Sequence, residues 1–316
     1  MRQRLEFDTA LAALPRGQGA QYPGMATDLY AHDSSFAATV DTVLDLFDDA
    51  ELRADWLSER PRVPIGDVTR AQPLLFTMDY ALARLVLDRG VRPAALLGHS
   101  VGELVAAVLA EVFSLQDAVA IMRDRVRRLA DGPRGGTLTV AAGVQEIRPI
   151  LGKHPEVAIA AVNAPRQTAI AGLDTPLRAA EAELRAAGFT VLPVAARTAF
   201  HSPALAPLLE GLSPYESCAR GDPRIPLWSS ATTHPLDAAA VRDDAMWARQ
   251  PMAPVLFWAA LDRLVTTNGP VHLVDVGPGQ GLATVARRHP DVQRGHSTVT
   301  ALLPARRGVR VRRLTR

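Results

Sequence analysis

The chain has 316 residues, a net charge of +2, 48% hydrophobic residues and 22% charged residues. These proportions are typical of a globular enzyme and exclude a fibrous or largely disordered protein. Cys218 is the single cysteine, which excludes an internal disulfide, and no cysteine–histidine cluster has the spacing of a zinc site. The N-terminus is too charged for a signal peptide, and the apolar region 94–113 is too polar in its middle for a membrane span. We therefore expect a soluble, cytoplasmic protein without a metal site or a bound cofactor.

The sequence pI of about 9.0 reflects arginines that gather at the C-terminus. They are Arg306, Arg307, Arg310, Arg312, Arg313 and Arg316. Such a run could contact nucleic acid or an acidic partner, or it could be a solvated tail. We favour the tail and expect no nucleic-acid partner.

Helix and strand patterns alternate along most of the chain. In chain order they predict a strand over 9–14, a helix over 73–89, a strand over 94–98, helices from Ser100 to about Ala110 and over 115–130, a strand over 226–229, a helix over 255–264 and a strand over 271–276. Alternation of this kind predicts a parallel sheet covered by helices.

Between residues 135 and 198 the pattern changes. Here it predicts a strand, a helix, two strands, a helix and a strand, over 137–142, 144–151, 157–162, 168–171, 176–187 and 189–194, with Thr175 or Asp174 capping the second helix. This order is that of the ferredoxin-like split unit. We predict an α/β protein in which a large subdomain, 1–134 and 199–316, carries a small ferredoxin-like insertion, 135–198.

The strongest local signal is Gly98-His99-Ser100-Val101-Gly102, placed between a predicted strand and a predicted helix. The pattern G-x-S-x-G in this setting predicts a nucleophile elbow, whose tight turn projects the serine hydroxyl. A helix N-terminus after the serine also favours developing negative charge. We predict that Ser100 is a nucleophile.

A serine nucleophile needs a base, and an inward-facing cation needs an anion. His201 lies where the predicted insertion returns to the large subdomain, a junction that favours a cleft, although a structural loop histidine is the alternative. Arg125 falls on the apolar stripe of its helix, with Ile121 and Met122. Its partner could be a protein carboxylate or the carboxylate of a substrate.

Two glycine-rich turns are further candidates. The turn Gly17-Gln18-Gly19 could offer a backbone N–H to an oxyanion hole, or it could be a plain surface turn. The cluster 277–281 lacks the spacing of a phosphate loop, so we interpret it as a strand-to-helix turn.

Taken together, these segments resemble the malonyl-CoA:acyl-carrier-protein transacylase family, and most closely the acyltransferase domains of modular polyketide synthases. In order they are GQGAQYPGM (17–25), AQPLLFTMDYALARL (71–85), GVRPAALLGHSVGELVAA (90–107), SLQDAVAIMRDR (114–125), AAVNAPRQTAIAG (160–172), TAFHSP (198–203), WARQPMAPVLFWAAL (247–261) and DVGPGQGL (275–282). The resemblance covers nearly the whole chain.

The resemblance implies an α/β-hydrolase-like large subdomain and a ping-pong transfer. Its roles would be Ser100 as nucleophile, His201 as base oriented by the backbone carbonyl of Gln250, Gln18 and Val101 as oxyanion-hole N–H donors, Arg125 as the carboxylate anchor, and Gln72, His99, Asn163, Thr198 and Phe200 as pocket residues. An acyl-CoA and the phosphopantetheine of an acyl carrier protein would be the substrates.

The string Thr198-Ala199-Phe200-His201 resembles the malonyl-selective form at Phe200, whereas Thr198 matches neither the malonyl nor the methylmalonyl form. Arg16 interrupts the motif before Gly17, and Pro214 shortens the helix expected after His201. Two alternatives remain: an acyl hydrolase that clears carrier proteins, which would not need Arg125, and a non-catalytic docking domain of a synthase.

Overall fold

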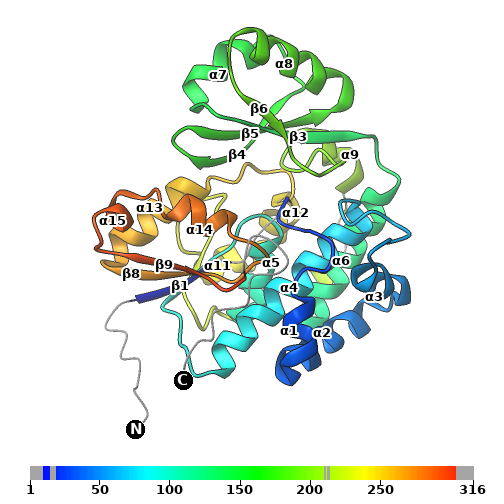
Figure 1. Ribbon diagram of the computed structural model, residues 1–316, viewed down its shortest axis with the longest axis vertical. Coiled ribbons are helices and arrows are strands. Elements are labelled where there is room, and N and C mark those ends of the chain that lie inside the picture. The colour runs from blue at the N-terminus through cyan, green and yellow to red at the C-terminus, as the bar shows by residue number, and fades with distance from the viewer. Residues whose placement is uncertain (1–9, 15–18, 210, 212–213, 304–316) are drawn as a thin grey trace.

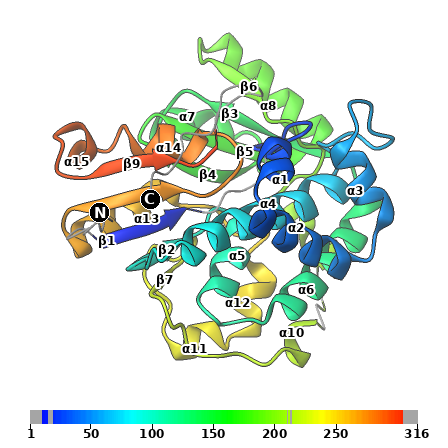
Figure 2. The same cartoon turned by 60° about the horizontal axis from the view of Figure 1, so that its bottom comes forward.

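The computed structural model describes residues 10–14, 19–209, 211 and 214–303, and it contains two separate sheets. The first has the order β7-β2-β1-β8-β9, and every neighbouring pair is parallel. Its strands are β1 (Ala10–Leu14), β2 (Ala95–Leu97), β7 (Leu227–Trp228), β8 (Val271–Asp275) and β9 (Thr298–Ala301). Figure 2 shows β7, β2 and β1 following one another across this sheet, with β9 at its far edge. The predicted parallel sheet is confirmed.

Helices cover both faces of this sheet because successive side chains of a strand point to opposite faces. Leu96 and Val274 pack into one cluster with α4 (Val68–Asp88) and α5 (Val101–Leu109). Leu97 belongs to a second cluster with α13 (Phe257–Asn268) and α14 (Gly281–Ala286). The outer layer of the first face is completed by α1 (Thr27–His32), α2 (Ser34–Phe47), α3 (Ala50–Leu57) and α6 (Leu115–Ala130).

The helix predicted over 73–89 begins earlier than expected, at Val68. The side chain of Asp67 caps it by accepting a hydrogen bond from the backbone N–H of Thr69. Pro73 therefore lies inside the helix rather than at its start. A cap of this type satisfies a backbone donor that the first turn leaves unpaired.

The second sheet has the order β4-β5-β3-β6 and is antiparallel throughout. Its strands are β3 (Gly135–Val140), β4 (Ala158–Ala164), β5 (Gln167–Leu173) and β6 (Val191–Pro193), and its helices are α7 (Val144–Leu151) and α8 (Asp174–Ala186). This is the arrangement of a ferredoxin-like unit, and its strands lie within 135–198, the range expected for the insertion. The predicted cap of α8 is wrong: the helix begins at Asp174, and Leu173 precedes it without a side-chain cap.

The small unit contacts the rest of the protein where β4 hydrogen-bonds to the segment that leads into α13. The N–H of Val162 donates to the carbonyl of Val255 (2.8 Å), and the N–H of Val255 donates to the carbonyl of Ala160 (2.9 Å). In Figure 1 the ferredoxin-like unit, in green, lies above the parallel sheet and its helices. This contact fixes the small unit above the carboxyl ends of the parallel strands, where open α/β sheets bind ligands.

Besides α13, α14 and the strands β7, β8 and β9, the described chain after His201 contains several short helices. They are the 3₁₀ turn Pro203–Leu205, α9 (Ala206–Leu209), α10 (Pro214–Ser217), α11 (Ala238–Val241), α12 (Asp244–Arg249) and α15 (Pro290–Gln293). The short helix expected before Pro214 is therefore confirmed. Among the described residues, no helix combines the length and apolar character that crossing a membrane requires.

Candidate active site

Ser100 occupies the turn between β2, which ends at Leu97, and α5, which begins at Val101. Its backbone has φ 57° and ψ −119°, a conformation that non-glycine residues rarely adopt. Gly98 permits this turn, because a Cβ there would lie 2.3 Å from the backbone of Glu103. The close approach of strand and helix thus forms the predicted elbow, in which backbone strain is held by surrounding structure.

The structure brings the predicted nucleophile and base together. Ser100 Oγ lies 2.6 Å from His201 Nε2, and both side chains are buried. His201 Nδ1 donates to the carbonyl of Ala253 (2.7 Å), which leaves Nε2 unprotonated and able to accept the serine proton. His201 also has a positive φ of 60°, and its backbone N–H donates to the carbonyl of Pro251 (2.8 Å).

Burial lowers the pKa of His201 to about 4. The carbonyl of Ala253 acts in the opposite direction, because it stabilises the protonated ring, whereas the nearby His99 and Arg125 lower the pKa further. At neutral pH the imidazole is therefore uncharged, which is the form that accepts a proton from a serine hydroxyl.

The expected role of Gln250 needs correction. The hydrogen bond that orients the base comes from the carbonyl of Ala253, and the Gln250 carbonyl has only a smaller effect on the pKa of His201. Ala253 lies three positions after Gln250, and its carbonyl faces the ring because the chain turns tightly after α12. The side chain of Gln250 instead donates to the carbonyl of Ser100 (2.9 Å) and to Glu103 Oε2 (3.2 Å).

Glu103 is a buried carboxylic acid that the sequence analysis missed. It lies in the first turn of α5 and also accepts a hydrogen bond from the N–H of Ser230 (3.1 Å). Burial raises the pKa of Glu103 despite these donors. The sequence feature that could have identified Glu103 is an acidic residue within an otherwise apolar helix. Gln250 and Glu103 together tie the elbow to the segment that holds the base.

The N–H of Val101, one of the two predicted oxyanion donors, follows Ser100 directly. Val101 is the first residue of α5, and its N–H has no acceptor among the residues that the structure describes. The N–H groups of Gly102 and Glu103 already bond to the carbonyls of His99 and Ser100. A free N–H beside the nucleophile at a helix N-terminus can stabilise an oxyanion. The other predicted donor, Gln18, and the neighbouring Arg16 lie outside the described residues.

Arg125 is buried on the inner stripe of α6, as its helical spacing predicted. Within the described part of the chain it forms no ion pair with a carboxylate, and its Nε has no hydrogen-bond partner. Its Nη2 donates to the hydroxyl of Tyr215 (3.1 Å), a residue that the sequence analysis missed. Of the two partners considered for Arg125, the protein carboxylate is therefore not found. A buried cation without a counter-ion is costly and favours an anionic ligand.

The remaining predicted pocket residues lie in three parts of the fold. His99 Nε2 donates to Asn163 Oδ1 (2.8 Å), so these two side chains join the elbow to β4 of the small unit. Gln72 is buried on α4. Thr198 and Phe200 are buried in the chain leading to His201, and the Phe200 ring packs in a small apolar cluster with Val68, Leu129, Leu205 and Leu209.

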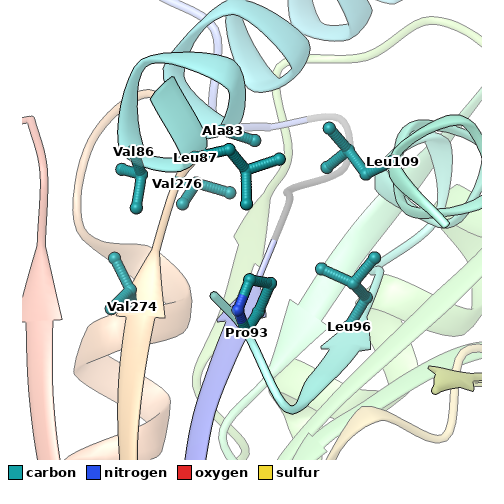
Figure 3. A pocket seen from close by; sticks show the side chains of 8 residues that line it. All are labelled: Ala83, Val86, Leu87, Pro93, Leu96, Leu109, Val274 and Val276. Carbon is teal, nitrogen blue, oxygen red and sulfur yellow. The ribbon is translucent and has the colours of Figure 1, made fainter. Parts of the chain in front are cut away.

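Two of the hollows that the described residues line differ greatly in size. A cavity of about 260 Å³ is lined by Glu103, Gln250 and Ala253, with Asp243 and Arg249 among its other lining residues. An apolar crevice of about 10 Å³ lies elsewhere, between α4, β2 and β8; Figure 3 shows its apolar lining. The crevice holds no more than a water molecule and contains none of the predicted site residues. No metal-binding cluster occurs among residues 19–209 and 214–303.

An α/β sheet that presents a serine–histidine pair at an elbow, with a helix N-terminal amide beside it, defines the class of acyl-transfer proteins. The comparison with known families is more specific. The model of the acyl transferase domain family matches residues 15–309, and the chain belongs to this family.

Known relatives agree with this assignment. The chain is 38% identical over 287 residues to a component of the phenolphthiocerol/phthiocerol polyketide synthase of Mycobacterium tuberculosis, covering 90% of this chain and 19% of that protein. It therefore spans about a fifth of that relative's length. Among solved structures, the acyltransferase domain from the second module of the salinomycin polyketide synthase has 30% identity and a TM-score of 0.84, covering 94% of this chain and 69% of that one. The acyl transferase domain of SpnD, in complex with 2-(pent-4-yn-1-yl)malonyl, has 31% identity and a TM-score of 0.86, with 95% and 72% covered.

Proposed function

We propose that this acyltransferase-family chain transfers a malonyl-type acyl group from coenzyme A to the phosphopantetheine thiol of an acyl carrier protein. The observation that carries the proposal is Arg125, a buried guanidinium without a carboxylate partner among the described residues. It lies close enough to His201 to lower that residue's pKa. An acyl group with a free carboxylate would supply the missing anion beside the reacting serine. Coenzyme A and the carrier's arm act as substrates, and the proposal needs no resident cofactor or metal.

In the first half-reaction, Ser100 Oγ attacks the thioester carbonyl while its proton passes to His201 Nε2, 2.6 Å away. The carbonyl oxygen becomes an oxyanion that the Val101 N–H stabilises, together with the Gln18 N–H that the family resemblance implies. The C–S bond then breaks, and His201 returns its proton to the departing thiolate of coenzyme A. An acyl-serine ester and free coenzyme A are the products.

The second half-reaction runs in the opposite sense. The carrier thiol gives its proton to His201 Nε2, and its sulfur attacks the ester carbonyl. When the tetrahedral intermediate collapses, the C–O bond breaks and Ser100 recovers its proton from His201. Because water would compete with the thiol, the ester must be shielded, and burial of both Ser100 and His201 favours this.

The choice among malonyl-type groups is a separate part of the proposal, and we favour malonyl. Phe200 is buried beside His201, with ring centroids 6.4 Å apart, and a bulky ring there leaves little room for an α-branch. A relative with 31% identity nevertheless holds a malonyl group with a long branch. One methyl group is worth only about 1–3 kcal/mol of discrimination. Competition between malonyl-CoA and methylmalonyl-CoA tests this choice, and preference for methylmalonyl-CoA would refute it.

The decisive experiment for the function is intact-protein mass spectrometry after brief mixing with malonyl-CoA, beside a Ser100→Ala control. We expect one malonyl adduct in the wild type, none in the control, and removal of the adduct by an added holo-carrier protein. Rapid loss of the adduct to water without a carrier would instead support a hydrolase. Absence of an adduct with any acyl-CoA would support a non-catalytic domain.

A further inference from the structure

Arg125 and Tyr215 form an unusual buried pair. The two side chains come from α6 and α10, with Arg125 3% exposed and Tyr215 1% exposed. The Tyr215 ring is part of the main core cluster, and Arg220 donates to the Tyr215 carbonyl (2.6 Å), so both ends of the residue are held. The hydroxyl therefore has a fixed position next to the guanidinium.

The direction of the hydrogen bond has a consequence for the tyrosine proton. A guanidinium can only donate, so the hydroxyl oxygen of Tyr215 accepts from Arg125 Nη2 across 3.1 Å. The O–H of Tyr215 must then donate to some other acceptor, and among the described residues there is none. Arg125 Nε is likewise buried without an acceptor. The Tyr215 O–H and Arg125 Nε are thus two neighbouring buried donors, one of them cationic, that find no acceptor in the part of the chain that the structure describes.

We propose that Tyr215 and Arg125 together form the binding site for the free carboxylate of the acyl group, with the Tyr215 hydroxyl donating to a carboxylate oxygen. This inference rests on the proposed function and adds Tyr215 as a specificity-determining residue. Because the Tyr215 hydroxyl accepts a hydrogen bond from Arg125 Nη2, the hydroxyl and the guanidinium lie side by side, and a single carboxylate can accept from both. A hydroxyl that accepts from a cation is also a stronger donor, since hydrogen bonds in a chain polarise one another.

Such a site should select for acyl groups that carry a carboxylate and against acetyl groups. A buried site built to hydrogen-bond a substrate rejects an analogue that leaves its polar groups unpaired. Acetyl-CoA is that analogue, because it has the same thioester and lacks the carboxylate. The Tyr215 hydroxyl should therefore affect malonyl transfer and leave acetyl transfer unchanged.

The test compares the wild type with Tyr215→Phe, measuring kcat/KM for acylation by malonyl-CoA and by acetyl-CoA. Loss of a hydrogen bond to a charged group typically changes an equilibrium or rate constant by about 10- to 100-fold. We therefore expect kcat/KM for acylation by malonyl-CoA to fall by roughly that factor. Acetyl acylation should stay within about twofold, because the ring is retained. The matched control is Tyr80→Phe, whose hydroxyl makes no hydrogen bond to the described residues; it should change neither rate. Thermal unfolding of each variant verifies that it is folded.

The outcomes separate the two levels of the proposal. If the wild type accepts malonyl-CoA and Tyr215→Phe slows both substrates equally, Tyr215 has a structural role and the inference is wrong. Unchanged rates for both substrates would also refute it. If the wild type forms no malonyl adduct, the proposed function itself fails, and this inference fails with it.

Discussion

The two halves of the candidate site differ in how completely the protein satisfies its own polar groups. Around Ser100 and His201, the protein supplies a partner for each ring nitrogen of the histidine, for its backbone N–H and for the serine carbonyl, although the N–H of Val101 has no acceptor among the described residues. Around Arg125 and Tyr215, a guanidinium nitrogen and a hydroxyl proton have no acceptor among the described residues.

In our proposal, the half around Ser100 and His201 carries out the chemistry, and the half around Arg125 and Tyr215 binds the ligand. Both Ser100 and His201 have positive φ values, and strained positions of this kind persist only where surrounding contacts hold them. The satisfied half is thus preorganised before any substrate arrives. On the same proposal, the unpaired donors of Arg125 and Tyr215 find an acceptor when the substrate carboxylate enters, and this half therefore selects the acyl group.

The largest loss of acylation rate should come from removing His201, the proposed base. His201→Ala removes the group that accepts the serine proton, and we expect acylation to fall by about 10⁵- to 10⁶-fold, as in other serine–histidine pairs. Time-resolved mass spectrometry of the acyl adduct measures it. The exposed His296 supplies the control His296→Ala, which should keep the wild-type rate. Substantial acylation by His201→Ala would show that another group serves as the base.

Replacing the guanidinium of Arg125 tests the proposed binding of the substrate carboxylate. Arg125→Ala should lower kcat/KM for malonyl-CoA by about 10²- to 10³-fold, because the substrate carboxylate would be buried without its counter-ion. Acetyl-CoA should react at least as well as with the wild type. Arg123→Ala, on the exposed face of the same helix, is the control. Equal losses with both acyl-CoA substrates would contradict an anchor role.

A smaller effect is expected where Gln250 joins the elbow to the base segment. Gln250→Ala removes the hydrogen bonds to the Ser100 carbonyl and Glu103, and it leaves a buried carboxylic acid short of a donor. We expect kcat for acylation to fall by about 10- to 100-fold with little change in KM for malonyl-CoA. Gln293→Ala, at an exposed helix end, is the control. A rise in KM alone would place Gln250 in substrate binding instead.

The smallest expected effect is that of pH on the acylation rate. Because burial lowers the pKa of His201 to about 4, the ring stays neutral as the pH falls below the usual histidine value. The rate should be level from about pH 8 to pH 5.5 and should fall by half near pH 4. Adduct formation at constant ionic strength provides the profile. A midpoint near 6.5 would mean that the ring is solvated in the working enzyme.

The elements of the site that lie on one stretch of chain could be predicted from the sequence. The elbow at Ser100 follows from a buried strand, a G-x-S-x-G turn and a helix within a few residues. The inward position of Arg125 follows from helical spacing alone. The alternation of helices and strands determined the parallel sheet, and the βαββαβ order determined the ferredoxin-like unit. His201 was suggested by its place at the junction and by family resemblance.

The tertiary structure decided which distant groups complete the site. Tyr215 is 90 residues from Arg125, and Gln250 is 150 residues from Ser100, so no local pattern predicts that they meet. Ala253 replaced Gln250 as the orienting carbonyl because a tight turn after α12, which no residue spacing specifies, aims that oxygen at the ring. Local periodicity fixes the direction in which a side chain leaves its own element, whereas its partner depends on how separate elements pack.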